Sequence, residues 1–405
     1  MQNNVKYKRY GNNMKIDYYA VGDPSDPRAW SGTYFELTNA LNNLGVLQRA
    51  YDIKPERLTS IKPEDKLIEK ITFILKNVRY FRYYEGKIYV SSEYYPDILE
   101  KARNIALQIY NTHAHPDAII VHGEFAVFEK TPFFIYHDLD MRTLLDWRLR
   151  DEKSYMCDAL PISILRKRVD DQKEAYSKAS GLLIASEWIG KSIKSYSERP
   201  EKVYTVGIGH NYKPIMLTES MLEERFENPR LLFIGKNGFR KGIDIVLSAF
   251  DVVRKEVPEA RLTIVTDLRD LPRNAKKDLD RMASSIDAYA TGISQDMLNE
   301  HYLNSSLFAM PSRFEAWGKV FFEAMAFGLP VIGAKNCAMP EFIKEDYNGY
   351  TTNYDSGEVA DRIISIFNSF EKYKIMSENA VKVSEKYTWD KIANNMVGII
   401  DRTIS

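Results

Sequence analysis

The fold is decided near the C-terminal end of the chain, by the stretch Ser312-Arg-Phe-Glu315-Ala-Trp-Gly318-Lys-Val-Phe-Phe-Glu323-Ala-Met-Ala-Phe-Gly328-Leu-Pro-Val-Ile-Gly333. The apolar run at 307–311 predicts a short buried strand, and residues 320–327 predict a helix that Gly328 and the following proline end. The turn between them leaves backbone N–H groups unpaired at a helix N-terminus, where they and the helix dipole favour a phosphate. The sequence therefore predicts an anion-binding turn with a glutamate on either side.

This segment resembles the E-x7-E signature of the retaining GT-B glycosyltransferases, glycosyltransferase family four in particular. Taken with the motifs below, the resemblance covers nearly the whole chain. It implies that Glu315 orients the transferred sugar and that Glu323 holds the ribose of the donor. The donor diphosphate would then meet the backbone amides of Gly318, Lys319 and Val320. Without the resemblance, two solvated helix glutamates would be the simpler interpretation.

Alternating strand and helix patterns fill both halves of the chain. Apolar runs that read as strands begin at Lys15, Ala118, Pro132, Gly181 and Val203, and again at Leu231, Arg261, Leu307 and Pro330. Such runs, separated by helices, predict parallel sheets with helices on both faces. The expected fold class is α/β, with two Rossmann-like domains that face each other across a cleft, as in the GT-B architecture that the resemblance implies.

The length of 405 residues exceeds what one hydrophobic core usually supports. We expect a Rossmann-like acceptor domain at 1–212 and a nucleotide-sugar donor domain at 213–387. The polar stretch 210–229 is the expected hinge. The resemblance implies that a last helix, at 388–405, returns to the first domain.

The composition limits which classes of binding partner and which cellular compartment we expect for the protein. Basic and acidic residues balance at 56 each, so nothing favours a nucleic-acid partner. The two cysteines, Cys157 and Cys337, cannot form a disulfide framework and fit a reducing cytoplasm. No run of eighteen apolar residues and no signal-peptide layout occurs. We expect a cytoplasmic protein, with peripheral membrane association and the oligomeric state left open.

A second motif lies at 233–242, where a strand is followed by three glycines and three cations, Lys236, Arg240 and Lys241. Glycines allow a close approach of the backbone to a ligand, and cations there can stabilise the charge that grows on a departing diphosphate. The motif resembles the Gly-Arg…Lys-Gly element of the family, with Lys236 at the usual arginine position. A basic loop that merely begins a helix is the alternative.

The first half of the chain supplies two weaker motifs. Trp30-Ser31-Gly32-Thr33 resembles the first glycine loop of the family, in which the amide of Gly32 approaches the donor phosphate and the acceptor. Trp30 is a candidate contact for the sugar or the acceptor, although Gly32 alone could simply begin a helix. His137 ends a predicted strand, so its side chain is expected at the ligand edge of the sheet, where the family uses a histidine to contact the transferred sugar.

Asp138 and Asp140 follow His137 and form an Asp-x-Asp pair, which could hold a divalent metal ion. We do not expect a metal, because the predicted donor site handles the diphosphate with cations and amides. The two aspartates are instead candidates for contacts with the sugar or the acceptor. Ile293, in the loop at 289–293, matches the family loop that lines the nucleotide base.

An aromatic and basic stretch at 71–96 interrupts the pattern and predicts a β-hairpin that turns at Glu85-Gly86. Such a surface can stack on sugars or contact a membrane-bound acceptor. Packing of the hairpin on its own domain would explain the aromatic residues equally well.

The sequence thus predicts a retaining hexosyltransferase that moves a hexose from a nucleoside diphosphate sugar to a hydroxyl acceptor, without metal or cofactor. UDP-hexose is favoured over GDP-hexose as the donor, and the acceptor is a glycan, a lipid-linked glycan or a small molecule. Retention is expected through front-face attack, in which the protein positions the reactants and stabilises the leaving diphosphate. A sugar-nucleotide epimerase and a non-catalytic sugar-nucleotide-binding subunit are the alternatives.

Overall fold

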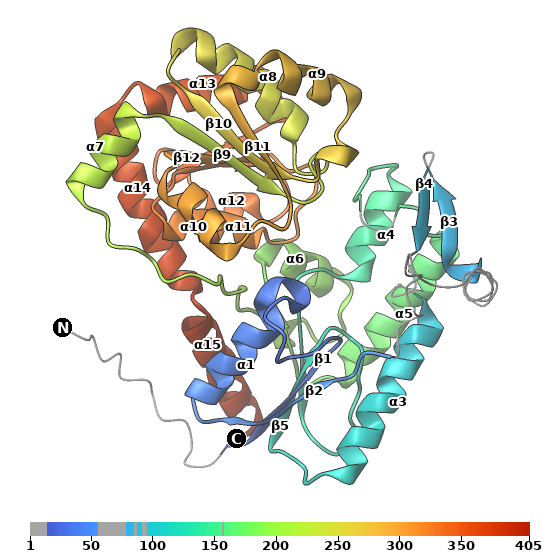
Figure 1. Cartoon of the computed structure of the whole chain (residues 1–405). Helices are drawn as coiled ribbons and strands as arrows, with labels where there is room; N and C mark the ends of the chain where they lie inside the picture. Colours follow the sequence, from blue (N-terminus) through green and yellow to red (C-terminus); the bar gives the residue numbers. More distant parts are fainter. Residues whose placement is uncertain (1–13, 56–77, 85–86, 91–94, 156–157) are drawn as a thin grey trace. The chain divides into compact units, whose positions relative to one another are not determined.

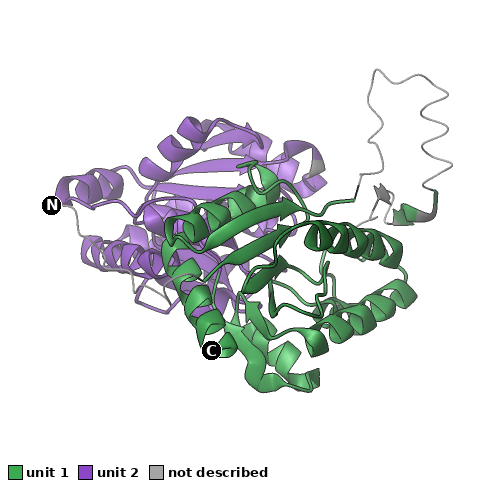
Figure 2. Cartoon of the chain, turned by 90° about the horizontal axis from the view of Figure 1, so that it is seen from below, with its two compact units in different colours: residues 1–207, 389–405 green, residues 208–388 purple. Residues whose placement is uncertain are grey.

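The chain forms two compact units, which we describe from a computed structural model that covers residues 14–55, 78–84, 87–90, 95–155 and 158–405. Unit 1 contains the described residues up to Gly207 together with Trp389–Ser405, and unit 2 contains Ile208–Thr388 (Figure 2). The boundary predicted from the sequence is residue 212. Of the two cysteines, Cys337 is a free thiol, and Cys157 lies outside the described residues.

The sheet of unit 1 has six parallel strands in the order β2-β1-β5-β6-β7-β8. Their bounds are β1 Ile16–Ala20, β2 Leu47–Asp52, β5 Ala118–His122, β6 Phe133–His137, β7 Gly181–Ile184 and β8 Val203–Thr205. The central strands β1, β5 and β6 are buried along their whole length. Helices cover both faces of this sheet, which explains why these strands are apolar throughout.

The helices of unit 1 are α1 Thr33–Asn43, α3 Pro96–Thr112, α4 Met141–Leu149, α5 Ile162–Lys178, α6 Glu187–Tyr196 and α15 Trp389–Ile404. Figure 1 shows α1 and α15 on one side of the sheet and α3 and α5 on the other. The last helix, α15, packs against α1 and β7 and buries an apolar face that includes Trp389, Met396 and Ile400.

The sheet of unit 2 also has six parallel strands, in the order β11-β10-β9-β12-β13-β14. Their bounds are β9 Arg230–Gly235, β10 Arg261–Thr266, β11 Ile286–Ala290, β12 Leu307–Ala309, β13 Val331–Ala334 and β14 Gly349–Thr352. In chain order this is 3-2-1-4-5-6, the strand order of dinucleotide-binding Rossmann domains. The expected α/β class with two Rossmann-like domains is therefore confirmed.

The helices of unit 2 are α7 Glu219–Glu227, α8 Ile243–Glu256, α9 Arg273–Arg281, α10 Gln295–Leu303, α11 Lys319–Ala326, α12 Met339–Phe342, α13 Ser356–Phe367 and α14 Phe370–Ser384. In Figure 1, α8, α9 and α13 lie on one side of the sheet, and α10, α11 and α14 lie on the other. Helix α7 lies within the stretch 210–229 that the sequence predicts as the hinge, and it packs against α14. Short 3-10 turns occupy Ala29–Gly32, Val78–Tyr80, Pro200–Lys202, Leu268–Asp270, Ala283–Ser285 and Glu385–Tyr387.

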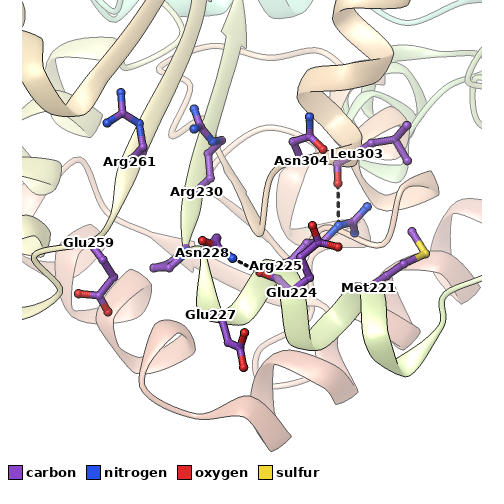
Figure 3. Close-up of a pocket in the computed structure, with 11 residues that line it drawn as sticks. Met221, Glu224, Arg225, Glu227, Asn228, Arg230, Glu259, Arg261, Leu303 and Asn304 are labelled. Carbon is purple, nitrogen blue, oxygen red and sulfur yellow. Dashed lines mark hydrogen bonds between the residues drawn. The ribbon is translucent and has the colours of Figure 1, made fainter.

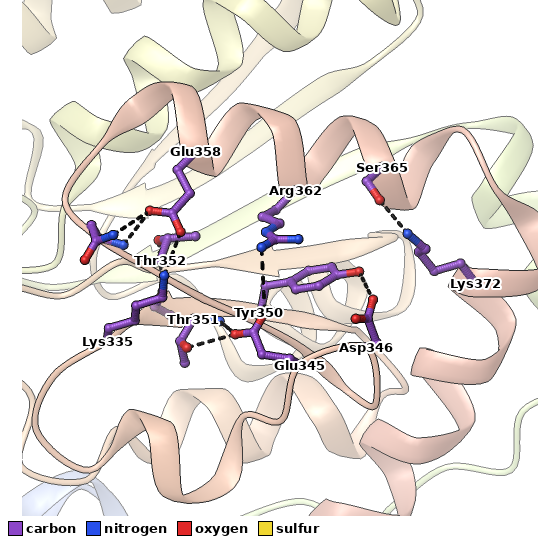
Figure 4. A network of polar contacts seen from close by, with 12 residues as sticks. Lys335, Glu345, Asp346, Tyr350, Thr351, Thr352, Glu358, Arg362, Ser365 and Lys372 are labelled. Carbon is purple, nitrogen blue, oxygen red and sulfur yellow. Dashed lines mark hydrogen bonds and ion pairs between the residues drawn. The ribbon is translucent and has the colours of Figure 1, made fainter.

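A polar network fastens the edge strand β14 and the loop before it (Figure 4). The Glu345 carboxylate accepts hydrogen bonds from the backbone N–H and the hydroxyl of Thr351, both at 2.9 Å. Lys335 pairs with Glu358 of α13 at 2.9 Å. These contacts satisfy polar groups at a sheet edge that no further strand covers.

The strands that the sequence analysis missed lie at sheet edges. β2 and β11 are only partly buried, so their sequences lack the continuous apolar run of a central strand. The predicted hairpin is present as β3 Phe81–Tyr84 paired antiparallel with β4 Lys87–Val90, whereas its turn at 85–86 and residues 71–77 and 91–94 lie outside the described residues. None of the described helices is both long and apolar enough to span a bilayer.

Candidate active site

The strand order of unit 2 creates one point where a ligand is expected. β9 and β12 are neighbours, but β9 leads to β10 on one side and β12 leads to β13 on the other. In open parallel sheets, ligands bind at the carboxyl ends of the strands at such a switch point. The loop at 236–242, which follows β9, and the loop at 310–318, which follows β12, both begin there.

The two loops lie in direct contact because Gly242 has no side chain. Its φ is +82°, and a Cβ atom on it would lie 2.4 Å from the carbonyl oxygen of Pro311. The Arg313 backbone N–H donates to the Arg240 carbonyl oxygen at 2.8 Å, and the Arg313 guanidinium pairs with Asp244 at 2.7 Å. The loops are therefore held as one rigid surface.

Three of the predicted side chains meet on this surface. Lys241 Nζ donates to Glu315 Oε2, and both side chains are buried. The Arg240 guanidinium lies 3.9 Å from the same carboxylate oxygen and donates to the Phe314 carbonyl oxygen at 2.8 Å. One carboxylate thus faces two cations, which leaves the cluster with net positive charge.

Burial alone would raise the pKa of Glu315, but Lys241 and Arg240 outweigh it and hold that pKa below its ordinary value. Burial lowers the pKa of Lys241, although Glu315 opposes this shift. The carboxylate is therefore ionised at neutral pH and committed to the two cations. Lys236, the third predicted cation, is exposed at the start of the same loop.

Helix α11 begins directly beside this cluster. Gly318 precedes it with φ of +83°, and its first two residues are Lys319 and Val320, whose N–H groups lie in the unpaired first turn. Trp317 fixes the start of the helix, because its indole N–H donates to the Ile208 carbonyl oxygen at 3.2 Å and its ring stacks on Phe322. The turn that the sequence predicts to bind an anion is thus the start of a helix whose position is fixed by packing.

Glu323 lies one turn further along α11. The Tyr302 hydroxyl donates to Glu323 Oε2 at 3.2 Å, and the Tyr302 ring stacks on Phe327 and meets Tyr212 edge-on. Burial raises the pKa of Glu323, and Lys319 and Tyr302 offset part of that shift. Neither tyrosine was predicted from the sequence, because neither belongs to a motif.

Ile293, which the sequence predicts to line the nucleotide base, lies half-buried in the loop between β11 and α10. It is next to Gly292, whose φ is +97°.

In unit 1, the structure gives His137 a different setting from the one expected. It ends β6, as predicted, but its Nδ1 donates to the Leu139 carbonyl oxygen at 2.9 Å and its Nε2 accepts from the Tyr176 hydroxyl at 2.7 Å. Both ring nitrogens thus have partners inside unit 1. A sugar would have to replace one of these hydrogen bonds to reach His137.

The two residues of the Asp-x-Asp pair have different surroundings in the structure. Asp140 is fully buried and accepts hydrogen bonds from the Ser192 and Tyr196 hydroxyls, both at 3.0 Å, so its carboxylate faces the domain interior. Burial raises the pKa of Asp140. Both of these partners of Asp140 belong to unit 1, while Asp138 is half-exposed directly after β6. The described residues contain no cluster of three or more His, Cys, Asp or Glu side chains suited to a metal ion.

His122, which was not predicted as a site residue from the sequence, lies beside the predicted glycine loop. Trp30 and Gly32 belong to a turn that precedes α1, and the Trp30 ring packs against Tyr34 and against His122, the last residue of β5. His122 also ends an apolar strand, so the rule that selected His137 applies to it as well.

A cavity of about 550 Å³ in unit 2 lies away from these residues (Figure 3). Arg230 and Arg261, the first residues of β9 and β10, line it, so it opens at the amino ends of the strands. The motif residues follow the carboxyl ends of β9 and β12. The cavity therefore is not the predicted donor site.

Comparison with known proteins shows that unit 2 is similar to glycosyltransferases. Residues 221–383 match the family model described as Glycosyl transferases group 1. The sulfoquinovosyl transferase SQD2 of Arabidopsis thaliana is 32% identical over 168 residues, which cover 40% of this chain and 31% of that protein. An uncharacterized glycosyltransferase of Haemophilus influenzae is 28% identical over 182 residues, which cover 44% of this chain and 50% of that protein. The chain thus spans between about a third and a half of these relatives.

Solved structures resemble the chain over nearly its full length. The sucrose-phosphate synthase of Thermosynechococcus elongatus superposes with a TM-score of 0.66 at 14% identity, covering 95% of this chain and 98% of that one. WaaG, a glycosyltransferase involved in lipopolysaccharide biosynthesis, gives 0.64 at 12% identity, covering 95% and 99%. These likenesses confirm the GT-B glycosyltransferase fold that the sequence predicted.

Proposed function

We propose that the chain is a retaining glycosyltransferase that moves a hexose from a nucleoside diphosphate sugar to a hydroxyl acceptor. The observation that carries the proposal is the buried cluster of Lys241, Arg240 and Glu315 beside the start of α11. It lies at the switch point of a Rossmann sheet, within the segment that matches glycosyl transferases group 1. Cations and a helix N-terminus in one place suit a diphosphate.

The chemistry follows from the fixed charges. The bond between the sugar C1 and the diphosphate oxygen breaks, and C1 forms a bond to the acceptor oxygen on the same face. The acceptor proton passes to an oxygen of the departing phosphate, so the nucleoside diphosphate and the glycoside are the products. Lys241 and Arg240 stabilise the charge that grows on the diphosphate. Glu315 pairs with these cations, which suits it to orienting the sugar rather than to covalent attack.

We propose UDP-hexose as the donor ahead of GDP-hexose. Solved structures of Anabaena HepE contain UDP and glucose, and that of TarM from S. aureus contains UDP. A Mycobacterium tuberculosis relative is named as GDP-mannose-dependent, so both bases belong in the test. The acceptor is proposed to be a glycan, a lipid-linked glycan or a small molecule, because the relatives act in such varied syntheses. A cytoplasmic location, where nucleotide sugars are made, completes the proposal.

The test is incubation of the full chain with UDP-, GDP- and ADP-hexoses, with and without excess EDTA. We expect slow release of nucleoside diphosphate from one donor, faster release with a suitable acceptor, and no loss with EDTA. NMR of the glycoside should show the anomeric configuration of the donor. For substitutions of Lys236, Arg240 or Lys241 in this assay, the matched control is Lys335→Ala, which removes a surface ion pair of unit 2. An isomerised donor would favour an epimerase, and binding without turnover would favour a non-catalytic subunit.

A further inference from the structure

The sheet of unit 1 has its own switch point, and a cluster of aromatic side chains surrounds it. β1 and β5 are neighbours, but β1 leads to β2 on one side and β5 lies next to β6 on the other. His122 ends β5, and the loop after β1 carries Trp30. The Trp30 ring stacks on Tyr34 with centroids 5.5 Å apart and meets the His122 ring edge-on at 4.2 Å. Ligands of parallel sheets bind at this place in the fold.

The backbone around Trp30 is held in an unfavourable conformation. Trp30 has φ of 45° and Ser31 has φ of 56°, and Gly32 follows with φ of 81°. Residues with a side chain rarely adopt this left-handed region, and such outliers concentrate at binding sites. The turn leaves Trp30 40% exposed, although a large apolar ring would normally be buried.

His122 is buried under this turn and lacks one hydrogen bond. Its Nδ1 contacts the Tyr18 hydroxyl at 3.1 Å, whereas its Nε2 has no partner among the described residues. Burial holds the pKa of His122 well below its ordinary value, so the ring is neutral at physiological pH. A buried polar atom without a partner destabilises the free protein, and a ligand hydroxyl that reaches it would remove that cost.

We propose that Trp30, Tyr34 and His122 form a binding site for the pyranose ring of the acceptor, so that the acceptor is a saccharide. A pyranose has one apolar face of C–H groups, which stacks on the negative face of an indole. Its hydroxyls point outward, toward polar groups such as His122 and the half-exposed Asp138, whose charge acts on Tyr34. An alkyl chain would instead require a groove lined by apolar side chains. This inference rests on the proposed transferase function.

The test uses ligand-observed saturation-transfer NMR on the full chain, with methyl α- and β-pyranosides of glucose, galactose, mannose and N-acetylglucosamine as probes. We expect saturation of the ring protons of at least one pyranoside. Trp30→Ala should weaken its binding at least tenfold, whereas Trp30→Phe should retain most of it. The matched control is Tyr347→Ala, which removes an aromatic ring of unit 2 that is as exposed as Trp30, at 40%. Circular dichroism checks that each variant is folded.

Calorimetry with UDP and GDP separates this inference from the proposed function. Trp30→Ala should leave the affinity for the nucleotide unchanged, because the predicted cations, the start of α11 and Glu323 belong to unit 2 and the Gly32 amide of unit 1 is retained. Two outcomes would overturn the inference while nucleotide binding still supported the transferase. One is an equal loss of pyranoside binding in Trp30→Ala and Tyr347→Ala, and the other is no binding of any pyranoside to the wild type. If the wild type binds neither UDP nor GDP, this result would instead refute the proposed function.

Discussion

The ion pair between Lys241 and Glu315 combines two effects that a single substitution cannot separate. Both side chains are buried, so removal of one partner leaves the other as an uncompensated charge. The same lysine is proposed to stabilise the departing diphosphate. Stability and turnover therefore have to be measured together.

We predict that Lys241→Ala lowers the free energy of unfolding by about 3 kcal/mol and lowers turnover about a hundredfold. The double variant Lys241→Met with Glu315→Gln should regain most of the stability, because it buries no charge, while turnover stays low. Urea unfolding and release of nucleoside diphosphate measure the two quantities. Recovery of turnover in the double variant would contradict the proposed role of Lys241.

Glu323 allows a separate test of the nucleotide end of the site. We predict that Glu323→Ala weakens UDP or GDP binding by about 1.5–3 kcal/mol, because a charge-assisted bond to ribose is lost. Tyr302→Phe, which removes the hydroxyl at 3.2 Å from Glu323, should have a smaller effect in the same direction.

Calorimetry with inorganic pyrophosphate is the control for Glu323, since pyrophosphate has no ribose and its affinity should not change. An equal loss for pyrophosphate and UDP would show that Glu323 acts on the phosphates or on the fold instead.

Single residues were predictable from sequence where a local motif surrounds them. Lys241 and Glu315 each lie in a glycine-containing loop after a strand, and the structure brings them together. The setting of His137 was not predictable, because its partner Tyr176 lies 39 residues away on α5. Tyr302 likewise reaches Glu323 across 21 residues. Only the folded packing of helices on the sheet creates these contacts.

The two loops that follow β9 and β12, which would form the proposed donor site, pack closely only because residue 242 is a glycine. We predict that Gly242→Ala costs at least about 3 kcal/mol of stability, because the new methyl group meets the Pro311 carbonyl oxygen in a left-handed backbone. Gly45→Ala is the control, since its φ is +72° but no atom lies within 4 Å of the added Cβ. It should cost only about 1 kcal/mol. Equal losses in thermal melts would contradict this explanation.

Strand β1 contains a carboxyl group that makes stability depend on pH. Asp17 lies opposite Arg49 of β2, and burial raises its pKa from 3.8 to about 6, with Arg49 opposing. The folded chain therefore binds more protons than the unfolded chain between about pH 4 and pH 6. The free energy of unfolding should fall as the pH rises through this window.

We predict that Asp17→Asn raises the free energy of unfolding at pH 7 by about 1–2 kcal/mol and removes this pH dependence. Asp287→Asn is the control, for which we expect a change in stability of the opposite sign. Burial alone would raise the pKa of Asp287, but Arg230 and Arg261 outweigh it and hold that pKa below its ordinary value. Asp287→Asn should therefore destabilise the chain at pH 7. Urea titrations from pH 4 to pH 8 distinguish the two behaviours.

Elements were predictable according to their position in a sheet. Central strands such as β5 and β12 are buried on both faces, so their sequences are continuous apolar runs. β11 alternates between half-buried and exposed residues and was missed. β14 is buried, but its sequence Gly-Tyr-Thr-Thr has no apolar run, so a pattern of hydrophobicity could not identify it either.

Helix α15, the last helix of the chain, belongs to unit 1, although the residues of unit 2 separate it from the rest of that unit. α15 packs on α1 and β7, whereas residues 208–388 contain a complete sheet and its helices. We predict that a fragment of residues 208–388 folds alone and binds UDP or GDP. A fragment of residues 1–207 should not unfold cooperatively, because the apolar faces that α15 covers would be exposed to water.

The control restores the helix. His210 and Thr388 pair in a short parallel bridge, so the chain can be rejoined there. Residues 1–209 linked to 388–405 through a few glycine and serine residues should recover a cooperative thermal transition. A cooperative transition of the 1–207 fragment alone, at the temperature of the rejoined chain, would contradict the required role of α15.

The position of α15 also has a consequence for synthesis of the chain. Residues 1–207 leave the ribosome long before Trp389–Ile404, so the surfaces of α1 and β7 that this helix covers stay open while translation continues. Residues 208–388 have all of their own elements earlier than that. The later-made unit can thus complete its folding before the earlier-made one, the reverse of the usual order in nascent multidomain proteins. In a released chain that ends at residue 388, protease should therefore cut unit 1 and spare unit 2.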